Sequence, residues 1–492
     1  MPRISLPIAN GFYVSDSLPI SNQECVNWYA NIPQTPGALS QESLYGCPGI
    51  SQALTTGAVN QINRGAHVKN SKPYFVNGTS LYRVDKSVDG DGLTVFTSVL
   101  LGTIPGAGRV SMADNGTQLM VLVPGGNGYI IDETSGTPFI QITAPGFTAN
   151  GAPQLVEFVD SFFVCNTDTK KYIKSASNDG TSWSALEFGS AESDPDPIAS
   201  IHVHNNKLYL AGTETIEEHQ NIGAGGFPFQ RTGFFIDKGV YAPFSMISTN
   251  NTFMWIGGGT NESPAIWSLA GNTAQKISTT AIDSALQDFT EEEIQQAFAY
   301  SYAQNGAYFV GFSLPTRTFE YNAITGRWNE RKSQIINGKG LTETLRWRVN
   351  SIVTAYNKVF CGDSQDGRLG TVEVDTYSEY DSEIIRTVSI QPLSDLGNAI
   401  SVTELEATFE SGVGDLVTVD PQIRMSTSED GRSFSDELSV SLGKVGEYNK
   451  RCIWTRLGRF PRMAVFKFVM SDKVKPVFIK LEARVRSSVR GN

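Results

Sequence analysis

Between Ser200 and Gly212 the chain reads Ser-Ile-His-Val-His-Asn-Asn-Lys-Leu-Tyr-Leu-Ala-Gly. A run of mixed apolar residues enters the Asn205-Asn206 pair, and a second run, starting at Leu208, leaves it. Asparagine tolerates the positive φ that the favoured two-residue hairpin turns require. The stretch therefore predicts a short β-hairpin with its turn at the two asparagines.

The same pattern recurs along much of the chain. Seven copies are marked by the second residue of their turns, namely Gly78, Gly116, Ser161, Asn206, Asn251, Gly306 and Asn357. The intervals between successive marks are 38, 45, 45, 45, 55 and 51 residues. A repeating β unit of about 40–50 residues is typical of propeller blades, each a four-stranded sheet. We expect an all-β fold with a β-propeller of six or seven blades. The alternative is another all-β fold, because Asn-Gly turns are common in all-β proteins.

Composition and charge limit the function classes. The 492 residues carry a formal net charge of −11, which argues against a general phosphate-binding surface. The five cysteines are far apart and odd in number, so they predict neither a metal site nor a disulfide framework. The first residues lack the apolar core of a signal peptide, and no stretch approaches the roughly 18 apolar residues of a membrane helix. We expect a soluble protein that is not conventionally secreted and has no membrane-spanning segment.

The chain divides into three parts by composition. Residues 1–55 lie outside the repeat and are expected to form an N-terminal arm with aromatic anchors at Trp28-Tyr29. Such an arm must pack on the body or on a neighbouring molecule. Residues 56–372 hold the repeats and form the propeller. Residues 373–492 are expected to form a C-terminal, platform-like β domain, to which the arm contributes, with a basic face from Lys444 to Arg490.

One segment breaks the β pattern. Near residues 281–304 apolar residues fall at helical spacing, and Thr290 followed by Glu293 fits a capping box. We interpret this segment as one short helical insertion within the propeller, and it accounts for the interval of 55 residues.

Two further stretches predict strands. Residues 318–329 form an expected outer hairpin with its turn near Thr325-Gly326, and Tyr321 and Trp328 flank that turn as a cross-strand pair. Residues 477–485 alternate strictly, which is typical of a half-buried strand.

His202 and His204 are the first candidates for chemistry, because two positions apart on a strand they share a face and could chelate a metal. The position of His202 is taken in other copies by Met112, Glu157, Ile247 and Tyr302. No third ligand is evident, so a strand position is favoured over a metal site.

Acidic turns are the other candidates. The Asp-Gly turns within 177–183, 364–370 and 428–434 are close to the Asp-box turns of sialidases but one residue shorter, and such turns are structural. The loops 89–92 and 194–197 could hold Ca²⁺, although neither completes the spacing of a calcium loop. We predict no catalytic, cofactor-binding or metal-ligating residue, and no cofactor.

A set of ordered patches gives a resemblance to a known family. The patches are Glu217-Glu-His-Gln-Asn221, Phe227-Pro-Phe-Gln-Arg231, Ala242-Pro-Phe-Ser245, Phe253-Met-Trp-Ile-Gly257 and Ile277-Ser-Thr-Thr-Ala-Ile282, with Asn27-Trp28-Tyr29, Thr325-Gly-Arg-Trp328, Gly443-Lys-Val-Gly-Glu-Tyr448 and Trp454-Thr-Arg-Leu-Gly458. In this order they resemble the tail-hub, or nozzle, proteins of short-tailed phages, also called packaged-DNA stabilisation proteins. The patches cover most of the chain, and none is a catalytic motif.

The resemblance implies a structural virion protein and not an enzyme. It implies a homohexameric ring below the portal and its head-to-tail adaptor, which continues the DNA channel and retains the packaged DNA until ejection. A tail needle or tip plugs the ring, and tailspikes or fibres attach around it. Duplex DNA passes through without sequence-specific binding, which suits the acidic body. The implied location is the virion tail, assembled in the host bacterial cytoplasm.

Two other functions stay open at this point. A glycan-binding or glycan-hydrolysing β-propeller would bind sugars as an isolated protein. A host adaptor propeller is compatible with the acidic charge, but the ordered phage-like patches do not favour it.

Overall fold

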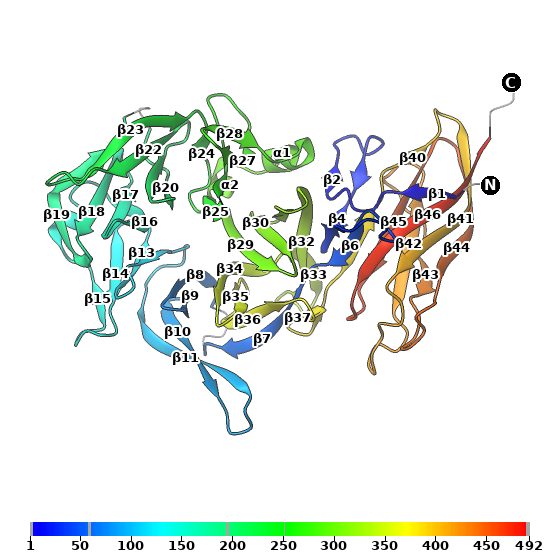
Figure 1. The fold of residues 1–492 in the computed structure, drawn as a ribbon, viewed down its shortest axis with the longest axis horizontal. Coiled ribbons are helices and arrows are strands. Elements are labelled where there is room, and N and C mark those ends of the chain that lie inside the picture. Colours follow the sequence, from blue (N-terminus) through cyan, green and yellow to red (C-terminus); the bar gives the residue numbers. More distant parts are fainter. Residues whose placement is uncertain (1–2, 58–60, 193–195, 250, 489–492) are drawn as a thin grey trace.

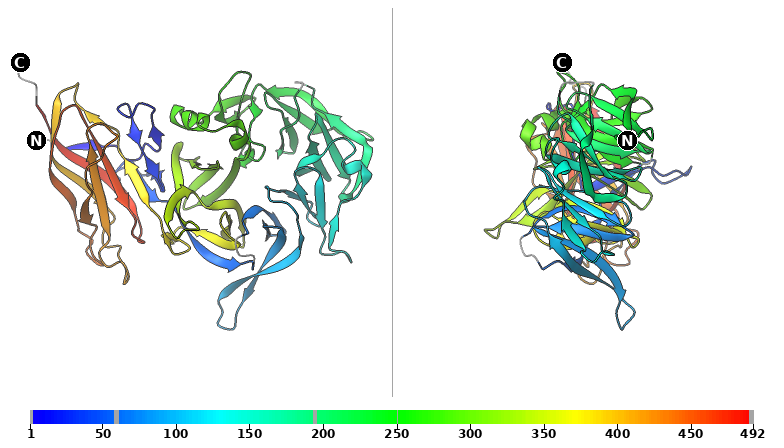
Figure 2. Two further views of the ribbon diagram at one scale, coloured as in Figure 1. Left: turned by 180° about the vertical axis from the view of Figure 1, so that it is seen from behind. Right: turned by 90° about the vertical axis from the view of Figure 1, so that its left-hand side faces the viewer.

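The computed structural model describes residues 3–57, 61–192, 196–249 and 251–488. In this part of the chain a β-propeller and a β-sandwich lie side by side (Figure 1). Figure 2 shows the same arrangement from behind and from the side. The first strand, β1 (Arg3–Leu6), pairs with the last, β46 (Val477–Ser488), so both ends of the described chain belong to the sandwich.

Seven blades surround the propeller axis in the described residues. The first four are β8–β11 (Asn63–Lys69, Lys72–Asn77, Ser80–Val88, Thr94–Thr103), β12–β15 (Ser111–Asp114, Leu119–Val123, Asn127–Ile131, Phe139–Gln141), β16–β19 (Pro153–Val159, Phe162–Thr167, Lys171–Ala176, Asp179–Ser190) and β20–β23 (Ser200–His204, Lys207–Ala211, Ile216–Asn221, Phe229–Ile236). A 3₁₀ turn, Pro145–Phe147, precedes the third blade.

The remaining blades carry extra strands. They are β24–β28 (Gly239–Val240, Ile247–Thr249, Thr252–Gly258, Ala265–Ala270, Thr273–Lys276), β29–β33 (Phe298–Gln304, Ala307–Ser313, Thr318–Asn322, Arg327–Ile336, Thr342–Arg346) and β34–β36 (Val349–Ala355, Lys358–Asp363, Arg368–Glu373) with β7 (Gly49–Thr55), β37 (Ser378–Glu379) and β38 (Ser382–Glu383). Contacts that run from β20 through β16, β12, β8, β34 and β29 to β25 place these strands at the axis.

Tight turns with positive φ join the first two strands of most blades. Asn205 and Asn206 have φ of 49° and 60°, and the equivalent turn in the first blade is Asn70-Ser71, at 50° and 63°. The mark at Gly78 is therefore wrong, because that Asn-Gly turn joins β9 to β10. Ser71 lies 45 residues before Gly116, so the correct turn restores the regular spacing. In the fifth blade Asn250 lies outside the described residues.

The last blade is completed by the N-terminal segment. Strand β7 pairs antiparallel with β36, and Ile50 faces Val372 in that register. Residues 49–55 thus lie in the propeller sheet, although composition places them in the arm. Composition cannot reveal this, because the partner strand is more than 300 residues away in the sequence.

Two helices separate the fifth and sixth blades. They are α1 (Thr280–Gln287) and α2 (Glu291–Gln295), and Thr290 and Glu293 form the predicted capping box. The helical part is shorter than the expected 281–304. Residues 298–304 instead form β29, where Phe298, Tyr300 and Tyr302 are buried at every second position, as a strand with one buried face requires.

The sandwich combines strands from both ends of the chain. One sheet holds β1, β5 (Trp28–Asn31), β6 (Ser43–Gly46), β41 (Ala399–Phe409), β44 (Cys452–Phe460) and β46; the other holds β4 (Cys25–Val26), β39 (Arg386–Ser389), β40 (Leu393–Ser394), β42 (Gln422–Ser428), β43 (Leu438–Ser441) and β45 (Met463–Met470). A small pair, β2 (Tyr13–Val14) and β3 (Asn22–Gln23), completes the arm. The arm therefore packs on the body of its own chain.

Candidate functional site

The propeller and the sandwich meet at the arm. Strand β4 pairs parallel with β32 at Val26 and Glu330, and antiparallel with β39 at Val26 and Thr387. These pairings join the sixth blade to one sheet of the sandwich, so that a single sheet runs from β29 to β43. We take this junction as the candidate functional site, because its strand pairings fix the orientation of the two bodies relative to each other.

Asn27 is the polar centre of the junction. Its φ is +57°, and its backbone N–H donates to the carbonyl oxygen of Glu330 at 2.8 Å. Its side-chain Nδ2 donates to the carbonyls of Lys332 at 2.9 Å and Ile385 at 2.8 Å, and its Oδ1 accepts from the Lys332 N–H at 3.1 Å. Asparagine suits the site because it tolerates the left-handed region and carries both a donor and an acceptor.

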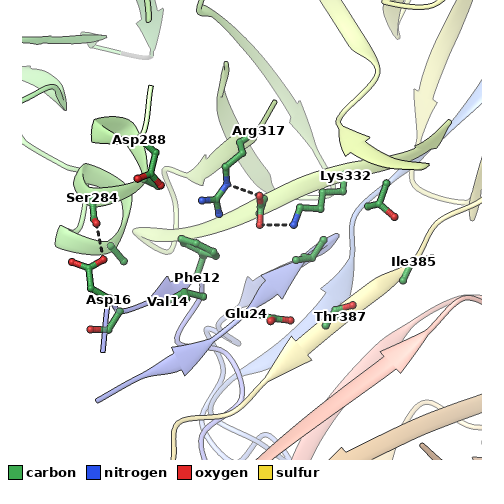
Figure 3. Close-up of a pocket in the computed structure, with 16 residues that line it drawn as sticks. Phe12, Val14, Asp16, Glu24, Ser284, Asp288, Arg317, Lys332, Ile385 and Thr387 are labelled. Atoms are coloured by element: carbon green, nitrogen blue, oxygen red, sulfur yellow. Dashed lines mark hydrogen bonds and ion pairs between the residues drawn. The ribbon is translucent and has the colours of Figure 1, made fainter. Parts of the chain in front are cut away.

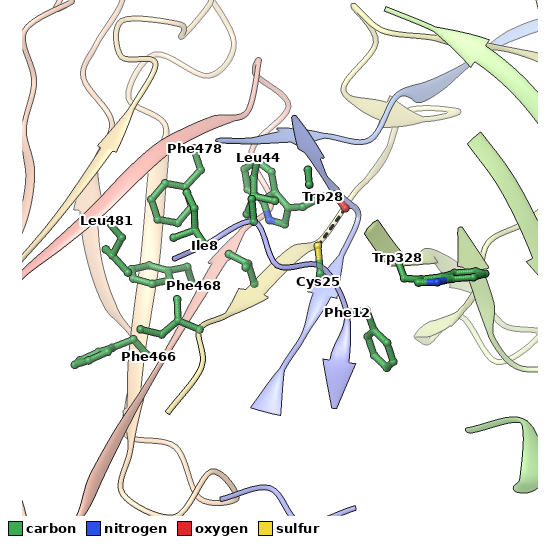
Figure 4. Close-up of a cluster of buried hydrophobic side chains, with 14 of the residues drawn as sticks. Ile8, Phe12, Cys25, Trp28, Leu44, Trp328, Phe466, Phe468, Phe478 and Leu481 are labelled. Atoms are coloured by element: carbon green, nitrogen blue, oxygen red, sulfur yellow. Dashed lines mark hydrogen bonds between the residues drawn. The ribbon is translucent and has the colours of Figure 1, made fainter. Parts of the chain in front are cut away.

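An apolar cluster lies on the sandwich side of this residue (Figure 4). Trp28 is buried with Leu44 and Phe478, and the Cys25 thiol donates to the Trp28 carbonyl at 3.3 Å. Burial raises the pKa of the Cys25 thiol far above its usual range, with a smaller contribution from Cys47. The thiol is thus a packing group and not a nucleophile.

The apolar cluster continues into the propeller. Phe12 of the arm donates its backbone N–H to the Trp328 carbonyl at 2.6 Å. Trp328 is buried beside Tyr321, with ring centroids 4.9 Å apart, and the two residues face each other in the β31–β32 register. The predicted outer hairpin is confirmed, and its tryptophan also belongs to the junction.

A buried charge cluster lies behind the junction. The side chains of Arg331 and Glu320 are both 0% exposed, and their Nη1 and Oε2 atoms are 3.6 Å apart. The guanidinium stacks 4.0 Å from the ring centroid of Trp347, and Glu320 accepts from the Tyr302 hydroxyl at 3.0 Å. A second carboxylate, Glu379, is 3.9 Å from the guanidinium.

Sequence reasoning missed this cluster, although a signal was present. Glu330 and Arg331 directly follow the predicted outer hairpin of residues 318–329, and a continuation of its second strand points their side chains to opposite faces of the sheet, as on β32. Both faces of this strand are covered in the structure, so both charges are buried and each needs a partner.

A cleft of about 470 Å³ opens at the junction between the arm, α1, β32 and β39 (Figure 3). Glu330 accepts from Arg317 at 2.9 Å and from Lys332 at 3.2 Å, and the Ser284 hydroxyl donates to Asp16 at 2.7 Å. The lining residues that the structure describes include no histidine or cysteine. These contacts hold the arm, the helix and the blade together.

The two candidate histidines share a face, as expected. His202 Nε2 and His204 Nδ1 lie 2.9 Å and 3.1 Å from the Ser248 hydroxyl oxygen, in the next blade. Both side chains are buried, and they link neighbouring blades.

The acidic turns lie in widely separated places. Asp179, Asp366 and Asp430 each accept a hydrogen bond from the backbone N–H two residues on, at 2.9, 2.9 and 2.8 Å. They stand in the third blade, the seventh blade and the sandwich. Asp89 closes its own loop by accepting from the Leu93 N–H at 2.8 Å. Of the loop 194–197, residues 194 and 195 lie outside the described residues.

The expected basic face of the sandwich is a mixed one. Arg3 contacts Glu404 and Glu406 at 2.6 Å each, and Arg451 contacts Glu406 at 2.7 Å. Arg484 lies 3.5 Å from Glu404. The carboxylates come from β41, outside the basic run of the sequence, so counting charges in that run alone hides the pairing.

Comparison with known proteins gives the family. A family profile described as "Bacteriophage P22 Gp10, beta-propeller" matches residues 4–377, and one described as "Bacteriophage P22 Gp10, beta-sandwich" matches residues 387–486. The chain belongs to the bacteriophage P22 Gp10 family. This membership confirms the resemblance drawn from the ordered patches and the all-β fold class of propeller and second β domain.

Among individual Gp10 relatives, the tail hub protein gp10 of Salmonella phage P22 is 22% identical over 503 residues, which covers 96% of this chain and 97% of that protein. Two solved structures are also similar. The WD40 beta propeller domain of Doa1 has 13% identity and a TM-score of 0.38, covering 66% of this chain and 98% of its own. The computationally designed Ika8 protein has 10% identity and a TM-score of 0.33, covering 65% and 99%.

The helices bear on one further expectation. Within the described residues, no helix combines the length and the apolar character needed to cross a membrane.

Proposed function

We propose that this chain is a structural virion protein, the tail hub of a bacteriophage, without enzymatic activity. The observation that carries the proposal is the pair of Gp10 family matches, which together span the propeller and the sandwich. The relative from Salmonella phage P22, which this chain matches over 97% of its length, is itself a tail hub protein.

The hub is a homohexameric ring below the portal and the head-to-tail adaptor. A ring needs one surface patch and its complement on every subunit, held at a fixed angle. The continuous sheet through β4 supports this, because its strand pairings connect the two bodies directly. The functional units are a propeller of residues 56–372, closed by β7 and extended by β37 and β38, and a platform of the remaining arm with the rest of residues 373–492.

The ring continues the DNA channel, retains the packaged DNA and serves ejection. Duplex DNA passes through without sequence-specific binding, and the net charge of −11 supports this, because few phosphates would be neutralised on the way. A tail needle or tip plugs the ring, and tailspikes or fibres attach at its side. The protein resides in the virion tail and is assembled in the host bacterial cytoplasm.

Electron microscopy of the chain co-expressed with its neighbouring tail genes tests the proposal. We expect a six-fold ring with a central hole, stacked on a wider collar. A chain that stays monomeric, never joins a particle and binds sugars on a glycan array would overturn it in favour of the glycan-binding propeller.

A further inference from the structure

Two adjoining cavities lie at the axis of the propeller, away from the cleft at the junction. The smaller, of about 260 Å³, is lined by residues in or next to the innermost strands of five blades, β8, β12, β25, β29 and β34. The larger, of about 460 Å³, adjoins it and shares Arg109 and Phe244 with it.

Two arginines line the larger cavity. The guanidinium of Arg109 stacks on the Phe298 ring, 3.7 Å from its centroid, and lies 5.7 Å from that of Phe244. The guanidinium of Arg346 lies 5.8 Å from the same Phe298 centroid. The two cations therefore share one aromatic ring.

The hydrogen-bond partners of these arginines are neutral or missing. Arg346 donates to Ser313 Oγ at 3.2 Å, to the Trp347 carbonyl at 2.8 Å and to Asn350 Oδ1 at 2.6 Å. Nε of Arg109 is buried without a hydrogen-bond partner in the described structure. Burial, and next the like charge of Arg346, lowers the pKa of Arg109 to about 9.

No carboxylate among the described residues lines either cavity. The carboxylate that acts on Arg346 from a distance is Asp363, and Arg348 already binds it at 2.7 Å. In a chain with a net charge of −11, this is a site of concentrated positive charge without its own counter-ion. Desolvated cations without a partner are costly, and guanidinium groups bind planar oxyanions well.

We propose that the larger axial cavity binds a small oxyanion, a phosphate or carboxylate group held between Arg109 and Arg346. The side-chain amide of Gln295 borders the same cavity and supplies a further polar group. Phe298 positions both guanidinium groups beneath the ligand. The inference does not depend on the tail-hub function.

Calorimetric titration of the full chain with inorganic phosphate and, separately, with citrate tests the site. Ionic strength is kept constant with chloride, because general screening would otherwise mimic binding. We expect one anion per chain with half-saturation at or below about 1 mM, and a weakening of about tenfold or more in Arg109→Gln. The matched control is Arg432→Gln, which removes an exposed arginine of the sandwich and should leave binding unchanged.

A second variant separates binding from folding. Gln295→Glu places a carboxylate at the cavity, so it should raise the melting temperature in anion-free buffer and remove the stabilisation by added anion. Binding of phosphate alone or of citrate alone identifies the group that the site prefers. The proposal is overturned if the wild-type chain binds neither probe, or if Arg109→Gln binds both as tightly as the wild type.

Discussion

At the scale of single residues, Trp328 serves two packing surfaces at once. It is 3% exposed, its Nε1–H donates to the Ile277 carbonyl at 3.0 Å, and its strand receives the arm through Phe12. Replacing it by alanine should destabilise the protein by about 3–5 kcal/mol, because a large buried side chain leaves a cavity. The midpoint of denaturant unfolding measures this. Ile324→Ala, on the exposed turn of the same hairpin, is the control and should unfold at the wild-type midpoint. If Trp328→Ala also unfolds at the wild-type midpoint, Trp328 is not a core residue.

Arg331 makes a sharper case, because its partners are buried carboxylates. Arg331→Met keeps most of the volume but leaves Glu320 and Glu379 without their cation. Breaking a buried pair from one side is expected to cost about 3–5 kcal/mol. A double variant, Arg331→Met with Glu320→Gln, should recover part of the loss. Thermal melting should rank the wild type above the double variant and the double variant above Arg331→Met. An Arg331→Met protein as stable as the wild type would contradict the prediction.

At the scale of elements, the arm is part of the core. Strands β1, β4 and β5 fall within residues 1–30 or end just after them, and Ile8, Phe12 and Trp28 belong to the main apolar cluster. Deleting residues 1–30 should therefore unfold the sandwich and leave the propeller, whose closing strand starts at Gly49. Limited proteolysis followed by mass spectrometry should show rapid cleavage within 387–486. Resistance equal to that of the full chain would place the arm outside the core.

The charged face of the β1–β46–β41–β44 sheet predicts a pH dependence. Hydrogen bonds from Arg451 are the main cause that lowers the pKa of Glu406 below its ordinary value of 4.5. A carboxyl whose pKa is depressed on folding stabilises the protein above its ordinary pKa, and that contribution is lost as pH falls through the folded-state value. Glu406→Gln should thus melt below the wild type at pH 7, and the gap should narrow as pH falls below about 4.5 and disappear below the folded-state pKa. Glu429→Gln, on an exposed turn, should show no such convergence.

At the scale of the whole molecule, the propeller closes through a strand from the other end of the chain. Ile50 of β7 is 1% exposed and faces Val372 of β36. Ile50→Ala should destabilise the protein by about 2–5 kcal/mol, and the effect should extend to the whole propeller, because β7 completes its circle of blades. Hydrogen exchange should rise in β36 and also in distant blades, whereas Gln52→Ala, at an exposed position of β7, should leave it unchanged. If faster exchange is confined to β7, the stability of the propeller does not depend on this closure.

The sequence by itself determined what local chemistry controls. Asparagine and glycine pairs favour positive φ, so the hairpin turns and their spacing identified the propeller. Thr290 and Glu293 identified the α2 cap, and Tyr321 with Trp328 the outer hairpin. The same local logic failed at Gly78, because an Asn-Gly turn looks alike whichever two strands it joins.

Only the tertiary structure decided the contacts between distant segments. The closure by β7 and the parallel bridge of Val26 to Glu330 each join residues more than 300 positions apart along the chain, and the Arg331 cluster takes Glu379 from the neighbouring blade. The Arg109 cavity gathers residues from the axis side of several blades in the same way. Periodicity shows which face of a strand is buried, but the partner of that face depends on the closed geometry of the whole ring and on the sandwich that the two ends of the chain build together.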